Sequence, residues 1–170
     1  MRDKIVVPGG ALWLRPARPE DEDFRFDLFR AYRMEVLRLG RLSDATIDEL
    51  LTSQYESRMR SFRERFPRAS WSVVEFEGTP IGELVIDDSA DSICVVDVAL
   101  RPGYQRRGFG SALIRALTAK AGGRGVRAMV LMTNAASLGM FRRLGFVDSG
   151  HDSAHIELRW PPLREIKGGG

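Results

Sequence analysis

Cysteine and histidine are scarce in this chain, which holds one cysteine, Cys94, and two histidines among its 170 residues. A single cysteine cannot form a disulfide within the chain, and Cys94 lies in an apolar run where a small core side chain is expected. One Cys and two His do not supply the cluster of ligands that a zinc site requires. The sequence therefore predicts neither a disulfide framework nor a metal centre.

Long hydrophobic runs are also missing. No stretch approaches the roughly 18 consecutive apolar residues that indicate a membrane-spanning helix. No basic segment followed by an apolar stretch precedes the first expected strand, so a secretion signal is not indicated. These absences predict a cytoplasmic protein that does not act at a membrane.

Charge of one sign is nowhere concentrated. The formal net charge is +3, from 26 Lys and Arg against 23 Asp and Glu, and the two signs are interleaved along the chain. A surface that tracks nucleic-acid phosphates needs a denser basic patch, so no nucleic-acid partner is expected. The length suits one domain with a single substantial core. The sequence leaves a monomer and a homodimer equally open.

The patterns of apolar and turn-forming residues predict one mixed α/β domain over residues 11–160. Residues 1–10 contain Pro-Gly-Gly without periodicity and are interpreted as a loose leader, and residues 161–170 as a tail. The expected order is β-α-α-β-β-β-α-β-α-β-β, with Thr46 and Glu49 as a capping box of the second helix. Strands are predicted at 11–16, 70–76, 81–86, 93–100, 127–132, 146–147 and 154–160, and helices at 20–39, 46–66, 111–120 and 134–144. The crossover through helix 111–120 predicts that strands 93–100 and 127–132 are parallel.

The turn Gln105-Arg-Arg-Gly-Phe-Gly110 joins strand 93–100 to helix 111–120. Free backbone N–H groups, the positive end of the helix dipole and two guanidinium groups would all point to one spot. Glycines at positions 108 and 110 keep side chains out of the way, so phosphate oxygens can approach the amides closely. The turn is therefore predicted to bind an anion.

The pattern of this turn identifies which anion is expected. The chain has neither the GxGxxG pattern of dinucleotide sites nor the GxxxxGK[ST] pattern of nucleotide triphosphate sites. It has Q-x-x-G-x-G after a strand that ends in Leu-Arg-Pro, which resembles the acyl-CoA pyrophosphate loop of the GNAT N-acetyltransferase family. The segment from Asn134 to Phe146, a short helix opened by Asn and closed by Gly-Phe, is similar to the second signature of that family. The order of elements from about Leu12 to Trp160 also resembles it.

The resemblance implies an acyl-CoA dependent N-acetyltransferase. Such an enzyme moves an acetyl group from acetyl-CoA to a primary amine of a small molecule or peptide, by direct attack in a ternary complex and without a metal. In the family the two central parallel strands splay apart, and the pantetheine arm pairs with free backbone groups of the first strand. Carried to this sequence, the implied CoA-binding residues are Val98, Leu100, Gln105, Arg106, Arg107, Gly108, Phe109, Gly110, Ser111, Asn134 and Phe141.

Two steps of acetyl transfer have candidate residues. The resemblance puts the backbone N–H that stabilises the oxyanion near Leu100. A carboxylate should take the proton of the attacking amine, and Asp97 and Glu83 are the candidates. Asp97 can equally be a satisfied structural carboxylate, and for Glu83 the structural role is favoured over that of the base.

The proton donor for the leaving thiolate is where the sequence departs from the family pattern. Many relatives carry Tyr four residues before the Gly-Phe pair, and this chain has Phe141, which cannot donate a proton. Ser137 is a candidate substitute, and Tyr32, Tyr55, His151 and His155 are weaker ones. Alternatively the thiolate leaves unassisted, or the protein is a non-catalytic CoA-binding or regulatory module.

Overall fold

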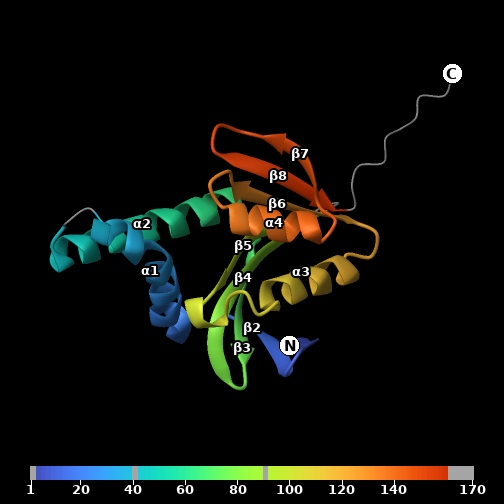
Figure 1. Ribbon diagram of the computed structural model, residues 1–170, viewed down its shortest axis with the longest axis horizontal. Helices are drawn as coiled ribbons and strands as arrows, with labels where there is room; N and C mark the ends of the chain where they lie inside the picture. Colours follow the sequence, from blue (N-terminus) through green and yellow to red (C-terminus); the bar gives the residue numbers. More distant parts are fainter. Residues whose placement is uncertain (1–2, 40–41, 90–91, 161–170) are drawn as a thin grey trace.

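The computed structural model describes residues 3–39, 42–89 and 92–160 (Figure 1). In chain order its elements are β1 (Asp3–Val7), β2 (Gly10–Pro16), α1 (Glu22–Leu39), α2 (Asp44–Arg65), β3 (Ser70–Phe76), β4 (Thr79–Ser89), β5 (Ser92–Leu100), α3 (Phe109–Lys120), β6 (Gly125–Leu131), α4 (Ala135–Arg143), β7 (Val147–His151) and β8 (His155–Trp160). Single 3₁₀ turns precede α1 and follow β5. The predicted mixed α/β domain is confirmed.

The strands form one sheet in the order β1-β2-β3-β4-β5-β6-β8-β7. Neighbours are antiparallel except β5 and β6, which run parallel as predicted because helix α3 carries the chain back across the sheet. The sheet is therefore antiparallel on both sides of one central parallel pair.

The central parallel pair separates soon after it forms. Among the described residues, only 92–95 of β5 pair with β6, opposite 125–128. Strand β5 nevertheless continues to Leu100 and stays paired with β4 along its other edge, where Gly82 lies opposite Leu100. The edge of β5 beyond Val95 thus faces a gap instead of a neighbouring strand.

Residues 3–10 are not a loose leader, which corrects the sequence interpretation for the described part of the segment 1–10. Asp3–Val7 forms β1 and pairs in antiparallel register with β2, with Val7 opposite Gly10. The Pro8-Gly9 pair makes the tight turn between them, where Gly9 has a φ of +82°. Val7 is buried whereas Val6, also apolar, is 79% exposed, so this short strand shows no alternation of apolar and polar residues in the sequence. Residues 161–170, interpreted as a tail, lie outside the described residues.

The N-terminus of α2 begins earlier than predicted. Its N-cap is Ser43, whose hydroxyl accepts a hydrogen bond from the Thr46 backbone N–H at 3.2 Å. Thr46 is therefore inside the helix and is not its cap. Ser43 and Thr46 lie three positions apart, and either hydroxyl fits the N-cap pattern in the sequence. In the structure the N-cap is Ser43.

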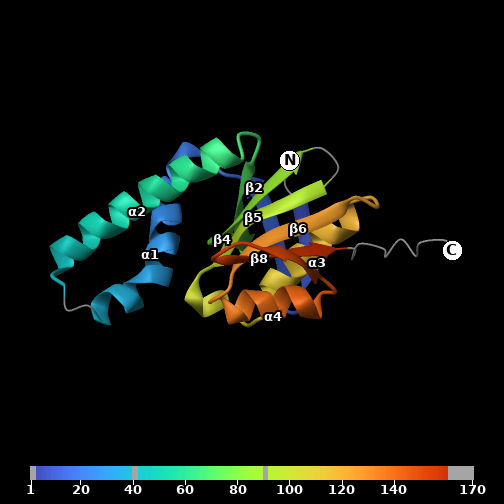
Figure 2. The ribbon, with the colours of Figure 1, turned by 90° about the horizontal axis from the view of Figure 1, so that it is seen from above.

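Helices α3 and α4 lie on one face of the sheet and α1 and α2 on the other (Figures 1 and 2), and the buried apolar residues form two cores. The larger core joins the sheet to α3 and α4 and includes Phe109, Leu113 and Phe141, while α1 and α2 enclose a smaller one around Leu51 and Tyr55. The gap between β5 and β6 therefore lies between a helical pair on each face.

Within the described ranges, no helix is both long and apolar enough to cross a membrane.

Gly82 is predicted to be indispensable for the close approach of β4 to the end of β5. A Cβ added at this position would lie 2.3 Å from the Ala99 carbonyl oxygen, which belongs to the backbone and cannot move aside. We expect Gly82→Ala to lower the free energy of unfolding by about 2 kcal/mol or more. The matched control is Gly103→Ala, where an added Cβ meets nothing within 4 Å. Equal unfolding midpoints in urea for the two variants would contradict this prediction.

Candidate active site

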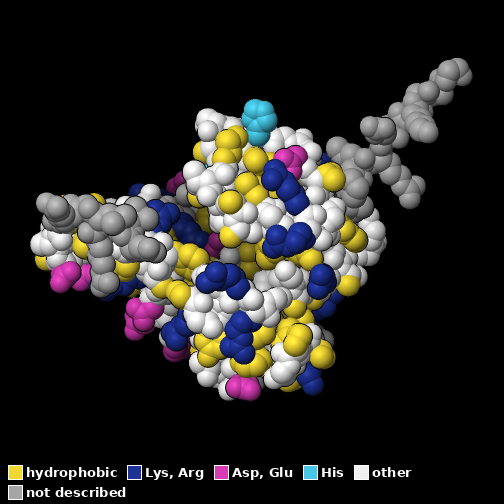
Figure 3. Space-filling model, viewed as in Figure 1, with side chains coloured by type: hydrophobic (Ala, Val, Ile, Leu, Met, Phe, Trp, Pro, Cys, Tyr) yellow, Lys and Arg dark blue, Asp and Glu magenta, His cyan; other side chains and the backbone are white. Residues whose placement is uncertain are grey.

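A cavity of about 610 Å³ opens where β5 leaves β6. Four elements line it: the end of β5, the turn that leads into α3 together with its first residues, helix α4 with the residue before it, and a single residue of α1. The lining residues are Tyr32, Val98, Leu100, Gln105, Arg106, Gly108, Gly110, Ser111, Asn134, Ala135, Ala136, Ser137, Met140 and Arg143. Figure 3 shows this face of the molecule hollowed at its centre, with Lys and Arg side chains beside the hollow.

The turn before α3 has the backbone shape of an anion-binding nest. Arg106 has a φ of +57° and Gly108 a φ of +82°, so the chain enters the left-handed region twice within three residues. Such alternation turns successive N–H groups toward the same side. The first amides of α3 have no intrahelical acceptor, and its N-cap Gly108 has no side chain to bond them. These donors and the helix dipole favour a phosphate group at this end of α3.

Gly110 allows the start of α3 to lie against α4. A Cβ at this position would come within 3.2 Å of Met140 Sδ. The start of α3 and helix α4 are thus close enough for Met140 to lie beside Gly110, and residues of both line the same cavity.

The electrostatic character of the cavity is positive. Arg106 and Arg143 line it, and none of its described lining residues is acidic. Arg107, which the sequence placed with Arg106, instead covers aromatic rings, with its guanidinium 5.0 Å from the centre of Phe109 and 5.5 Å from that of Tyr104. Arg143 was not singled out from the sequence, because a basic residue in the last turn of a helix has a sufficient explanation in the helix dipole.

The polar groups of Leu100 at the gap are bonded by two side chains from elsewhere. The Leu100 N–H donates to the Tyr32 hydroxyl at 2.9 Å, and the same hydroxyl donates to the Leu100 carbonyl at 2.7 Å. Gln105 Nε2 donates to the Leu100 carbonyl at 2.9 Å and to the Tyr32 oxygen at 3.0 Å. Tyr32 and Gln105 thus take the positions that a neighbouring strand would occupy.

Tyr32 is the residue whose importance the sequence understated. It lies on the stripe of α1 that the apolar periodicity identified, and it counted only as a weak acid candidate. The pKa of the Tyr32 phenol is raised, because burial disfavours the charged form. Hydrogen bonds with Leu100 and Gln105 lower this pKa but do not cancel the effect of burial. The phenol is therefore protonated throughout the neutral range. No local pattern could have paired Tyr32 with Leu100, because 68 residues separate them.

The two ends of α4 have different surroundings. Asn134 caps the helix, with its Oδ1 accepting from the Ser137 N–H at 3.1 Å, and both residues line the cavity. Phe141 is 2% exposed and packs edge-on against Phe146 at 4.9 Å between ring centres. The structure thus places Phe141, like Phe109, in the core and not among the lining residues.

The two carboxylates predicted as bases face the opposite side of the sheet, toward α1 and α2. Arg25 of α1 forms an ion pair with Glu83, and Arg58 of α2 forms one with Asp97. Glu83 is 4% exposed, and burial raises the pKa of its carboxyl although the charge of Arg25 opposes the shift. Each carboxylate therefore already has a cationic partner in the described structure.

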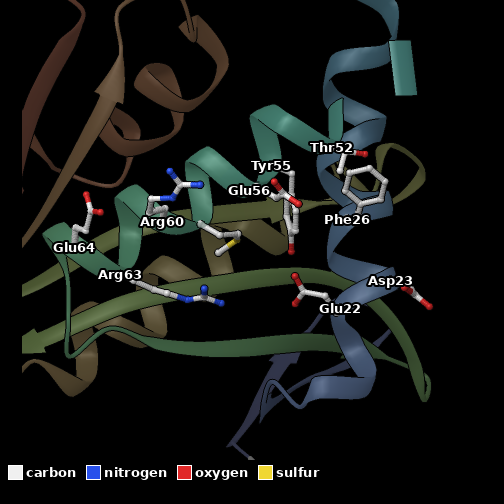
Figure 4. A pocket seen from close by; sticks show the side chains of 10 residues that line it. Glu22, Asp23, Phe26, Thr52, Tyr55, Glu56, Arg60, Arg63 and Glu64 are labelled. Carbon is white, nitrogen blue, oxygen red and sulfur yellow. The ribbon is translucent and has the colours of Figure 1, made fainter. Parts of the chain in front are cut away.

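A second cavity, of about 640 Å³, lies between α1 and α2 and shares no lining residue with the first. Figure 4 shows Tyr55 and Glu22 pointing toward one another inside it. The Tyr55 hydroxyl is buried and has no hydrogen-bond partner among the described residues. Four acidic residues, Glu22, Asp23, Glu56 and Glu64, and two arginines, Arg60 and Arg63, line this cavity, so acidic side chains outnumber basic ones. Within the described ranges no group of Cys, His, Asp and Glu could hold a metal ion.

Comparison with known proteins identifies the class of protein that this fold and cavity define. The model of the acetyltransferase (GNAT) family matches residues 39–146, more than half of the chain. The chain therefore belongs to the GNAT acetyltransferase family. Among curated proteins, no sequence is significantly similar to it.

Solved structures share the fold at low sequence identity. The PaiA N-acetyltransferase of Thermoplasma acidophilum, in complex with coenzyme A, has a TM-score of 0.64 and 17% identity over 87% of this chain and 97% of that chain. An acetyltransferase of Thermus thermophilus gives 0.64 and 18%, covering 92% of this chain and 98% of that chain. RimJ of Mycobacterium smegmatis, with CoA-disulfide, gives 0.61 and 19%, covering 93% and 85%.

The cavity residues fit acetyl-CoA, the co-substrate of this family. The nest and the first turn of α3 suit a pyrophosphate, Arg106 and Arg143 supply positive charge, and the edge of β5 offers backbone groups for a pantetheine amide. A Cβ at Gly108 would meet nothing within 4 Å, so the space beside that backbone is open.

The buried Arg25–Glu83 pair supports a prediction about stability. The two side chains are 10% and 5% exposed, so Arg25→Ala leaves a buried carboxylate without its partner. We expect a loss of about 3 kcal/mol in the free energy of unfolding. Arg30→Ala is the matched control, because Arg30 and its partner Asp48 are 39% and 54% exposed, and it should change little.

The same variant has a predictable pH dependence. Removing the guanidinium raises the Glu83 pKa further above its unfolded value. A carboxyl with a raised folded pKa stabilises the fold at low pH and loses that contribution as the pH rises through the folded pKa. The deficit of Arg25→Ala should therefore be smaller at about pH 5 than at about pH 8 in urea titrations. A deficit that grows as the pH falls would contradict this assignment.

Proposed function

We propose that this protein is an acyl-CoA dependent N-acetyltransferase that transfers the acetyl group of acetyl-CoA to a primary amine by direct attack in a ternary complex. The observation that carries the proposal is the convergence, on one cavity, of a turn shaped to bind phosphate, a strand edge without a neighbouring strand and the start of α4. Acetyl-CoA is an extended ligand that carries a pyrophosphate, a pantetheine arm and a thioester in that order. The turn suits the pyrophosphate, and the strand edge and α4 suit the arm and the thioester at its end.

Each segment of the cavity has a defined task under this proposal. The amides between Gly108 and Ser111 bind the pyrophosphate, assisted by the charge of Arg106. The backbone of Val98 and Leu100 binds the pantetheine arm as an added strand would. The Leu100 N–H stabilises negative charge on the thioester oxygen during attack. Asn134 caps α4, which holds Ser137 and Met140 against the same arm.

The attacking amine must lose a proton, and the groups on the α1 and α2 face are the candidates. Glu83 has a raised pKa, which brings a carboxylate closer to the range in which it acts as a base at neutral pH. Asp97 lies on β5, three residues before Leu100, with its carboxylate bonded to Arg58. We favour Glu83 over Asp97 as the group through which the proton leaves, directly or by way of water.

The acceptor is an amine of a small molecule or a peptide. Glu83 and Asp97, two carboxylates of the sheet that face α1 and α2, are each paired with an arginine, so neither is an unpaired carboxylate that could select a polycation. We therefore expect monoamines and peptide N-termini to be better acceptors than spermidine. Assays of CoA release with a panel of these amines test this expectation, and a strong preference for spermidine would contradict it.

The second candidate function, a CoA-binding module without turnover, is favoured by Phe141. This residue stands where the family pattern has a tyrosine, and it lies in the core, 2% exposed. Tight acetyl-CoA binding with no CoA release across the whole amine panel would select this alternative.

Binding of acetyl-CoA tests the assignment of the phosphate turn. Gly108→Asp puts a carboxylate where the pyrophosphate should lie, so affinity measured by calorimetry should fall at least about 100-fold, or about 2.7 kcal/mol. Gly123→Asp is a matched control, because Gly123 has a similar φ of +87°, has open space around it, and follows the other end of α3. The control should retain its affinity within about threefold. Equal affinities for the two folded variants would remove the basis of the proposed function.

A further inference from the structure

We propose that Tyr32 is a catalytic residue of this enzyme: its hydroxyl yields the Leu100 N–H to the thioester oxygen and then donates its proton to the departing CoA sulfur. This inference rests on the proposed acetyl transfer. It assigns the proton donor to α1, a helix that contributes no other described residue to the cavity lining.

The first step follows from competition for one donor. The Leu100 N–H has a single hydrogen, which is given to the Tyr32 hydroxyl at 2.9 Å. An oxyanion stabilised by that N–H must take the same position, so Tyr32 has to release it. The bond that replaces it is charge-assisted and stronger than a bond between neutral groups. The exchange is therefore favourable, and it leaves the hydroxyl next to the reacting carbon.

Tyr32 can make this small movement without disturbing a core. Its side chain is 48% exposed, and only its hydroxyl end is held, by Leu100 and Gln105. Gln105 Nε2 also donates to the Leu100 carbonyl at 2.9 Å, so that carbonyl keeps a partner after the hydroxyl leaves. Neither backbone group of Leu100 is therefore left without a partner when the exchange occurs.

Among the described lining residues, Tyr32 is the donor best matched to a thiolate. The other hydroxyls belong to Ser111, in the first turn of α3, and Ser137, on α4. A phenol has an ordinary pKa of about 10, close to the value of about 8.5 for a thiol, whereas an aliphatic alcohol is far less acidic. The two arginines of the cavity stay protonated under all ordinary conditions. Burial keeps the Tyr32 phenol protonated at neutral pH, as an acid catalyst must be.

The proposed step balances. The amine nitrogen forms a bond to the acetyl carbon, and the bond from that carbon to sulfur breaks with its electron pair going to sulfur. Tyr32 Oη gives its proton to that sulfur, which produces the free CoA thiol. The amine loses its extra proton to Glu83 or to water. The Tyr32 phenolate regains a proton from solvent, because Tyr32 is half-exposed. The net products are an N-acetyl amine and CoA, with no oxidant or further reactant.

Tyr32→Phe separates the two parts of the proposal, because it removes the hydroxyl and keeps the ring. The Leu100 N–H is then free before acetyl-CoA binds, so calorimetry should give an affinity about three- to tenfold tighter than that of the wild type. Turnover with a good amine acceptor should fall about 100-fold in kcat with little change in the KM of the amine. Tyr104→Phe is the matched control, since the Tyr104 ring packs against Phe76 outside the cavity lining, and both its affinity and its kcat should stay within about threefold.

A donor that needs no proton distinguishes an acid from a structural residue. Thiophenolate is a better leaving group than the CoA thiolate, so transfer from S-acetyl thiophenol should depend little on an acid. We expect the ratio of wild-type to Tyr32→Phe activity to shrink from about 100 with acetyl-CoA to about three with this donor. A ratio that stays near 100 with both donors would overturn proton donation, because a distorted site would impair both reactions.

The remaining outcomes are also decisive. Acetyl-CoA affinity and kcat both within threefold of the wild type in Tyr32→Phe would overturn the whole inference while leaving the proposed function intact. A wild type that binds acetyl-CoA and releases no CoA with any amine would overturn the proposed function, and proton donation by Tyr32 with it. Thermal melting of each variant verifies that it is folded, which the half-exposed position of Tyr32 favours.

Discussion

The early separation of β5 from β6 is the constraint on which the rest of this structure depends. Four residues pair, and the edge of β5 beyond Val95 is then left without a neighbouring strand. Buried backbone donors and acceptors need hydrogen-bond partners, so side chains or a ligand must bond the backbone groups of this edge. In the described structure Tyr32 and Gln105 form hydrogen bonds with the backbone of Leu100. The same requirement explains why an acyl donor with its own amides fits here, since it can supply what a strand would.

The two faces of the sheet divide the chemistry between them. Helices α3 and α4 build the positive cavity, which suits phosphates and a pantetheine arm, while α1 and α2 cover a face with two arginine–carboxylate pairs. Tyr32 reaches from α1 to the cavity and so joins the acceptor side to the donor side. Phe141 packs in the core against Phe146, and under the role proposed for Tyr32 a phenol from α1 replaces the tyrosine that many relatives have at the Phe141 position.

Most of the fold could be predicted from the sequence, because its information is local. The apolar periodicity of α1 to α4, the hairpin of β3 and β4 and the turn at Gly108 each depend on residues a few positions apart. Two errors came from the same locality. Strand β1 is too short to show a period, and it forms because Gly9 turns it onto β2. The α2 cap was assigned to Thr46 because Thr46 and Glu49 fit the capping-box pattern. The N-cap in the structure is Ser43, which offers an equivalent hydroxyl three residues earlier.

The sequence by itself determined the order of the elements from β2 to β8, the glycine turn before α3 and the segments that the family resemblance assigns to CoA, because each is encoded by contiguous residues. Only the tertiary structure decided which side chains meet. It brought Tyr32 to Leu100 across 68 residues, paired Glu83 with Arg25 across 58, and put Phe141 and Arg107 against aromatic rings instead of the cavity. Such contacts depend on the packing of α1 and α2 against the sheet, and packing is set by the shapes of distant surfaces, which no local pattern records.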